Sequence, residues 1–176
     1  MIAEIGHFAL ILALAVALVQ AVVPLVGASR GNAAWMALSG PTSAAQMLLV
    51  GIGFAALTHA YVTSDFSVMN VANNSHTDKP MLYKVAGVWG NHEGSLLLWI
   101  TILAIFGYAV TLFGRNLPPG LKARALAVQA MITVGFLLFI LLTSNPFARL
   151  EPPPINGSGL NPLLQDPGLA FHPPLL

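Results

Sequence analysis

Four long apolar stretches without a single Asp, Glu, Lys or Arg decide what this chain can fold into. They are Ile5–Val26, Ala44–Val62, Leu96–Phe113 and Ala125–Thr143. About 20 apolar residues in a helix span the hydrocarbon core of a bilayer, and backbone groups in lipid must be hydrogen-bonded within their own segment. The sequence therefore predicts an all-α integral membrane protein with four transmembrane helices, at about 5–26, 44–62, 96–113 and 125–143.

The composition excludes several other classes of protein. Only 7% of the residues are charged and 56% are apolar, whereas a soluble domain carries about 25% charged residues. Seven Lys/Arg and six Asp/Glu cannot cover a surface of this size in water, so we expect neither a soluble enzyme nor a disordered tail. A net charge of +1 without a basic cluster gives no case for nucleic acid binding. The absence of cysteine excludes disulfides and thiolate metal sites.

Basic residues near the helix ends predict the orientation in the membrane. One side would hold Arg30, Arg115, Lys122 and Arg124, and the other Lys79, Lys84 and Arg149. The count differs by only one, but the dense Arg115–Arg124 loop and the acidic start of the chain favour a cytoplasmic position for the first set. The first helix lacks the basic start of a signal peptide, so we expect it to be retained. Both termini and the loop 63–94 would then lie outside the cytoplasm.

The chain divides into a helical part and a proline-rich end. Residues 1–143 hold the four helices and the outer loop 63–94, which is rich in turn-forming residues. Residues 144–176 hold eight of the thirteen prolines. Proline lacks a backbone donor and extends the residue before it, so we expect an irregular extracytoplasmic segment there.

The motif Trp89–Trp99, with the sequence WGNHEGSLLLW, stands where the third long helix enters the membrane. Ser95 is a reasonable N-cap for the apolar run that follows. The two tryptophans, Trp89 and Trp99, fit an aromatic belt at headgroup depth, and the functional alternative is a flat apolar shelf for a planar ligand. The sequence leaves both interpretations open.

Histidines are the remaining candidates for chemistry. His92 and Glu93 lack the second histidine of a zinc-protease motif, because position 96 is leucine, so they are either solvated groups or, for Glu93, a partner of Lys84. His172 is followed by two prolines and is either a surface histidine or an iron ligand. Polar residues within the apolar runs usually face the bundle and bond to neighbouring helices, which we expect of four residues: His7, His59, Gln46 and Gln129.

Seven stretches of the sequence look familiar together: Glu4–Gly6, the region 80–84, Trp89–Trp99, Val134–Phe139, Thr143–Phe147, Leu160–Gly168 and Phe171–Leu176. In this order they resemble the CcmF family of cytochrome c-type biogenesis proteins. The resemblance covers the whole chain, but only the N-terminal portion of such proteins. By this resemblance the fold is the four-transmembrane-helix N-terminal part of a larger polytopic bundle.

The resemblance implies a haem lyase component in the bacterial inner membrane. Such a protein receives haem from the chaperone CcmE and acts with CcmH to attach it to apocytochrome c outside the cytoplasm. Its haem-binding residues would be His172 as axial ligand of the haem iron, and Trp89 and Trp99 as a possible shelf. The other motif positions are Gly90, Asn91, His92, Glu93, Gly94, Asn161, Pro162, Asp166, Pro173 and Pro174.

The resemblance also limits what this chain does alone. In the family the second outer histidine and the tryptophan-rich motif follow the position of Leu176, so we expect these 176 residues alone to be inactive. Propionate groups of haem would meet Lys79, Lys84 or Arg149. Two alternatives remain: a non-enzymatic membrane scaffold that docks other assembly proteins, or a haem transporter subunit.

Overall fold

The computed structural model describes residues 1–159 and Gly168. Its helices are α1 (Ile2–Arg30), α2 (Ala33–Ala37), α3 (Ser39–Val62), α4 (Met69–Asn74), α5 (Met81–Gly87), α6 (His92–Phe113), the 3-10 turn η1 (Gly114–Asn116) and α7 (Pro119–Leu142). Residues 1–159 contain no β-strand beyond one isolated bridge. Four helical stretches are long and apolar enough to cross a membrane, which confirms the predicted all-α membrane fold.

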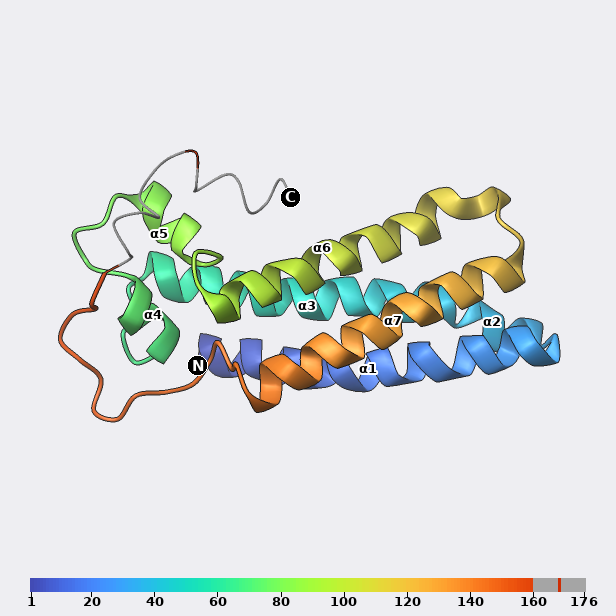
Figure 1. The fold of residues 1–176 in the computed structure, drawn as a ribbon, viewed down its shortest axis with the longest axis horizontal. Coiled ribbons are helices and arrows are strands. Elements are labelled where there is room, and N and C mark those ends of the chain that lie inside the picture. The colour runs from blue at the N-terminus through green and yellow to red at the C-terminus, as the bar shows by residue number, and fades with distance from the viewer. Residues whose placement is uncertain (160–167, 169–176) are drawn as a thin grey trace.

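The long helices α1, α3, α6 and α7 lie lengthwise beside one another (Figure 1). The end that carries Met1, α4, α5 and residues 143–159 is called the loop end. The opposite end, which carries Arg30, η1, Lys122 and Arg124, is called the basic end. Because the polar segments gather at the two ends, the apolar middle of the bundle matches the core of a bilayer.

Small residues let the helices approach closely, as is common in membrane bundles. Helix α1 packs against α3 and α7 along a buried stripe of alanines, and α6 packs against α3 and α7. A Cβ atom at Gly6 of α1 would lie 2.7 Å from Ala56 Cβ and 2.5 Å from Phe147 Cζ. Glycine is therefore needed where α1 crosses α3 beside the segment after α7.

Three glutamines join the helices inside the apolar part of the bundle. Gln46 Nε2 donates to the Ala13 carbonyl at 2.6 Å, and Gln129 Nε2 donates to the Leu103 carbonyl, so both predicted helix–helix contacts are confirmed. Gln20, which the sequence analysis did not single out, makes a third contact: its Nε2 donates to the Leu126 carbonyl at 3.3 Å. Each of these hydrogen bonds satisfies a glutamine Nε2 group, which could find no partner in lipid.

The helices extend beyond their charge-free cores. Helix α1 runs to Arg30 and stops where Gly31 adopts a left-handed conformation with φ 66°. Helix α6 begins at His92 because Asn91 caps it: Asn91 Oδ1 accepts from the Gly94 amide at 2.8 Å. The predicted cap at Ser95 is wrong, since the Ser95 hydroxyl instead donates to the His92 carbonyl within the helix.

The two histidines inside the apolar runs behave differently. His7 lies within hydrogen-bonding distance of the segment after α7, with 3.2 Å between its Nδ1 and Asn145 Nδ2. His59 is exposed, so the expectation that it faces the bundle is wrong. Near His59 the buried face of α3 is formed by residues 56, 57, 60 and 61, and the helical period places residue 59 outside that face.

Candidate functional site

A buried polar cluster holds the start of α6 at the loop end. Tyr61 at the end of α3 is fully buried, and its Oη donates to Asn70 Oδ1 at 2.6 Å. Asn91 Nδ2 donates to Tyr61 Oη at 3.0 Å. Asn70 Nδ2 donates both to Asn91 Oδ1 at 2.8 Å and to Glu93 Oε2 at 3.1 Å. The cluster therefore ties α3, α4 and the first turn of α6 together.

The tight turn beside this cluster explains Gly94 and Asn91 of the WGNHEGSLLLW motif, and Gly87 before the motif. A Cβ at Gly94 would lie 1.6 Å from the Val88 carbonyl oxygen, and one at Gly87 would lie 2.9 Å from the Tyr61 ring. Asn91 Nδ2 also donates to the Gly87 carbonyl at 2.8 Å. These residues close the tight turn between α5 and α6, so Asn91 and Gly94 have a positioning role at this end of the bundle.

The aromatic residues of the motif rest on different helices. Trp89 stacks on Phe54 of α3, with ring centroids 6.5 Å apart. Trp99 is 58% exposed and leans on Phe136 of α7, with centroids 6.2 Å apart. The two indoles therefore contact different helices and do not form one shared shelf. Trp99 has the more exposed ring.

Two lysines of the loop end, one buried and one half-buried, lack a carboxylate partner among the described residues. Lys84 on α5 is 9% exposed, and its Nζ donates to the Ser64 hydroxyl at 2.8 Å. Lys79 Nζ donates to the Asn74 carbonyl at 2.9 Å. Burial, together with the charge of Lys84, lowers the pKa of Lys79 to about 8. Among the described residues neither lysine forms an ion pair, so the predicted alternative that Glu93 pairs with Lys84 is wrong.

Arg149, in contrast, is fully engaged by acidic groups. Its Nε donates to Glu4 Oε1 at 2.9 Å, and its Nη1 lies 3.4 Å from Asp65 Oδ2. Partial burial acts to raise the pKa of Asp65, but the hydrogen bond from Ser67 and the charge of Arg149 hold that pKa below its usual range. Arg149 thus joins the start of α1 to the loop after α3.

The segment after α7 folds back across α4. The Leu150 amide donates to the Ser67 carbonyl at 2.9 Å, and the Met69 amide donates to the Ala148 carbonyl at 2.8 Å. Farther along, the Gly159 amide donates to the Ser75 carbonyl at 3.1 Å. The chain is therefore anchored to the loop end up to Gly159.

Six of the predicted site residues lie outside the described residues. They are Asn161, Pro162, Asp166, His172, Pro173 and Pro174. Within the described part of the chain, no group of three His, Cys, Asp or Glu side chains could hold a metal ion. His92 lies at the start of α6, and its ring is nearly perpendicular to that of Phe139, at a centroid distance of 6.0 Å.

The chain is similar to known proteins in both sequence and fold. The family model described as Cytochrome C assembly protein matches residues 89–176, which include the α5–α6 turn, α6 and α7. This chain belongs to that family. The match covers half of the sequence. The matched half includes the motif that contains Asn91 and Gly94.

Curated relatives extend the match to the whole chain. Over 176 residues the chain is 68% identical to the cytochrome c-type biogenesis protein Ccl1 of Rhodobacter capsulatus, of which it covers 27%. It is 51% identical to the CcmF protein of Escherichia coli, over 100% of this chain and 27% of that protein. The chain therefore spans about a quarter of the length of these relatives.

A solved structure has the same fold. It is titled Cytochrome c Heme Lyase CcmF and matches 84% of this chain and 25% of its own, with a TM-score of 0.79 and 26% sequence identity. The likeness of the whole bundle agrees with the resemblance found in the motifs, and it identifies the chain as similar to one quarter of a larger membrane protein.

Proposed function

We propose that this chain is part of the haem lyase of cytochrome c maturation, and that its loop end holds haem outside the cytoplasm for covalent attachment to apocytochrome c. The observation that carries the proposal is the likeness in fold to a structure titled as a haem lyase, with a TM-score of 0.79. The wider role in cytochrome c biogenesis rests on relatives that match over the whole chain. In the maturation system, CcmE would deliver the haem and CcmH would act beside this chain.

The described residues fit a haem carboxylate at the loop end. Of the three cations there, Arg149 is already paired with Glu4 and Asp65. Lys79 and Lys84 have only neutral oxygen partners among the described residues, and the proximity of their charges is unfavourable. A propionate beside them would relieve that repulsion and supply the missing negative charge. We therefore assign the propionates to this lysine pair rather than to Arg149.

Further residues of the chain would orient the group. His172 is proposed as the axial ligand of the iron, and the open ring face of Trp99 as an apolar contact. Bound haem would supply the vinyl groups that react with cysteine thiols. The protein's part is to bind the propionates, fix the plane and exclude water.

The distribution of charge supports the proposed orientation. Between Glu4 and Asp65, and again between Glu93 and Glu151, the sequence has no acidic residue, although it has five basic ones. Four of these five lie at the basic end: Arg30, Arg115, Lys122 and Arg124. Basic residues in short loops remain on the cytoplasmic side of a membrane. The loop end would then face the periplasm of a bacterial inner membrane.

A chimaeric protein tests the proposal. This chain would replace the corresponding segment of the Rhodobacter capsulatus relative, in cells that lack the native protein, and haem covalently bound to c-type cytochromes would be measured by haem staining of denaturing gels. We expect the chimaera to restore the cytochromes and His172→Ala to abolish them. The matched control is His59→Ala, an exposed histidine at the same end, which should leave the yield unchanged.

Two other outcomes are informative. Full cytochrome yield from the His172→Ala chimaera would contradict the ligand assignment and favour the scaffold alternative. Loss of haem from the purified chimaera in Lys84→Met, with the axial ligand intact, would support the propionate assignment. Unchanged haem content in Lys84→Met and in Lys79→Met would contradict it.

A further inference from the structure

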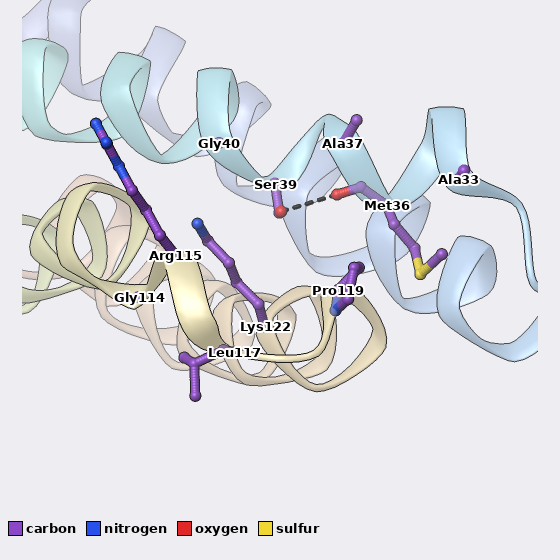
Figure 2. Close-up of a pocket in the computed structure, with 10 residues that line it drawn as sticks. All are labelled: Ala33, Met36, Ala37, Ser39, Gly40, Gly114, Arg115, Leu117, Pro119 and Lys122. Atoms are coloured by element: carbon purple, nitrogen blue, oxygen red, sulfur yellow. Dashed lines mark hydrogen bonds between the residues drawn. The ribbon is translucent and has the colours of Figure 1, made fainter.

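The basic end contains a cavity that the proposed haem chemistry does not use. It has a volume of about 460 Å3 and lies between α2, the start of α3, η1 and the start of α7 (Figure 2). Its walls are formed by Ala33, Met36, Ala37, Ser39, Gly40, Gly114, Arg115, Leu117, Pro119 and Lys122. Two cations and one hydroxyl therefore line a cavity whose other walls are apolar or backbone.

The two cations extend in the same direction, toward α3 (Figure 2). Lys122 Nζ donates to the Thr111 carbonyl at 2.9 Å, which fixes the ammonium group at the C-terminal end of α6 and leaves two further protons. Arg115 forms no hydrogen bond or ion pair with any described residue. The planar guanidinium is suited to bidentate binding of a phosphate or carboxylate. A negative group in the cavity would thus be held by both side chains.

No carboxylate of the bundle neutralises this end. The described acidic residues all belong to the loop end: Glu4, Asp65, Asp78, Glu93 and Glu151. Arg124 Nη2 donates to the Ala28 carbonyl at 3.1 Å and so occupies the end of α1, outside the cavity. The charge of the cavity therefore favours an anionic ligand.

An apolar groove adjoins the cavity. It also has a volume of about 460 Å3, and it is lined by Phe106, Ala109, Val110, Phe113, Gly114, Asn116 and Leu117. Gly114 and Leu117 line both the cavity and the groove, so the two adjoin at these residues. Phe106 and Phe113 lie on α6 seven positions apart, which corresponds to about 10 Å along the helix. The groove leads from the cationic cavity along the part of α6 that would lie in lipid.

We propose that the cavity and the adjoining groove together bind one anionic phospholipid, of the phosphatidylglycerol class. Its phosphate would lie between Arg115 and Lys122, and one acyl chain would lie against Phe106 and Phe113. Basic sites between transmembrane helices on the cytoplasmic side suit such headgroups. An inorganic phosphate would match the cavity but not the apolar groove, which favours the lipid. This site is separate from the loop end and does not depend on the haem proposal.

Native mass spectrometry of the purified chain in detergent tests the site. The chain would be titrated with phosphatidylglycerol and, in parallel, with phosphatidylcholine of the same acyl composition. We expect a preference for phosphatidylglycerol that Arg115→Gln weakens about fivefold to tenfold, since one interfacial cation contributes about 1 kcal/mol and bidentate bonds add to it. Arg115 has no partner in the described protein, so we expect the variant to fold, and far-ultraviolet circular dichroism would verify this.

The matched control is Arg30→Gln, which removes an exposed arginine of the same end that lines neither the cavity nor the groove. We expect less than a twofold change. An equal loss in Arg30→Gln, or equal binding of both lipids, would show general charge attraction and overturn the proposal. Phe113→Ala should weaken lipid binding, and millimolar inorganic phosphate should not displace the lipid. Complete displacement of the lipid by phosphate would show that the cavity binds phosphate and not a lipid, which would overturn the proposal.

Discussion

Replacement of Asn91 by alanine tests whether the buried cluster holds the motif in place. Asn91 Oδ1 accepts from the Gly94 amide and from Asn70, and its Nδ2 donates to Tyr61 Oη and to the Gly87 carbonyl. The alanine variant therefore loses the N-cap of α6 and the group that joins α3 to α4 and α6. No other described side chain reaches all of these partners.

The expected loss of stability is about 2–4 kcal/mol. Removal of an asparagine N-cap costs about 1 kcal/mol. Buried polar groups that lose a partner cost about 1–3 kcal/mol in total here, because Tyr61 Oη keeps its bonds to Asn70 and Asn70 Nδ2 keeps its bond to Glu93. Asn73→Ala is the matched control: Asn73 is exposed on α4, and its replacement should change stability by less than about 0.5 kcal/mol.

Stability would be measured by titration of the folded chain in mixed micelles with dodecyl sulfate, followed by circular dichroism. We expect the Asn91→Ala midpoint to fall well below that of the wild type and of Asn73→Ala. Equal midpoints for Asn91→Ala and the wild type would refute the cluster as a stabilising element. The geometry of the α5–α6 turn would then need another cause.

Four further perturbations can be measured in the same way. Gly94→Ala should destabilise the fold by more than about 3 kcal/mol, because the added Cβ would overlap the Val88 carbonyl, and an unchanged midpoint would contradict this. Gln46→Leu should change stability by less than about 1 kcal/mol, since the lost bond to α1 is offset by removal of a buried Oε1 that lacks a hydrogen-bond partner among the described residues; a loss above about 3 kcal/mol would contradict the offset. The pKa of Asp65 is lowered by folding, so the wild type should be more stable than Asp65→Asn above about pH 4. This difference in stability should disappear as the pH falls through the lower folded pKa. A difference in stability that does not depend on pH would contradict this. Folding lowers the pKa of Lys79 to about 8, so wild-type stability should rise between about pH 8 and 10, and Lys79→Met should lack that rise.

The bundle of four membrane-spanning helices could be predicted from the sequence because of its four long runs without charge. Long runs without charge can be placed only in a bilayer, and Gln46 and Gln129 within them can be satisfied only by neighbouring backbone. Helix ends were harder to predict. Ser and Asn are both favourable N-cap residues. Asn91 caps α6 because Tyr61 and the α5–α6 turn supply further hydrogen-bond partners for its side-chain amide.

The candidate site was only partly predictable from the sequence. The pairing of Arg149 with Glu4 joins residues 145 positions apart, and nothing local in the sequence indicates it. The burial of Lys84 depends on the fold of α5 against the end of α3, so its lack of a carboxylate partner among the described residues could be found only in three dimensions. The exposure of His59 depends on which side of α3 meets the other helices, and the sequence of α3 alone does not fix that side.

The most direct test concerns the side of the membrane on which the loop end lies. The chain has no cysteine, so Asn73→Cys at the loop end and Asn116→Cys at the basic end would each carry the sole thiol of the chain. Both positions are exposed. In intact cells a membrane-impermeant maleimide should label Asn73→Cys, and it should label Asn116→Cys only after the membrane is permeabilised. Labelling of Asn116→Cys alone in intact cells would place the lysine pair in the cytoplasm and contradict the proposed haem site.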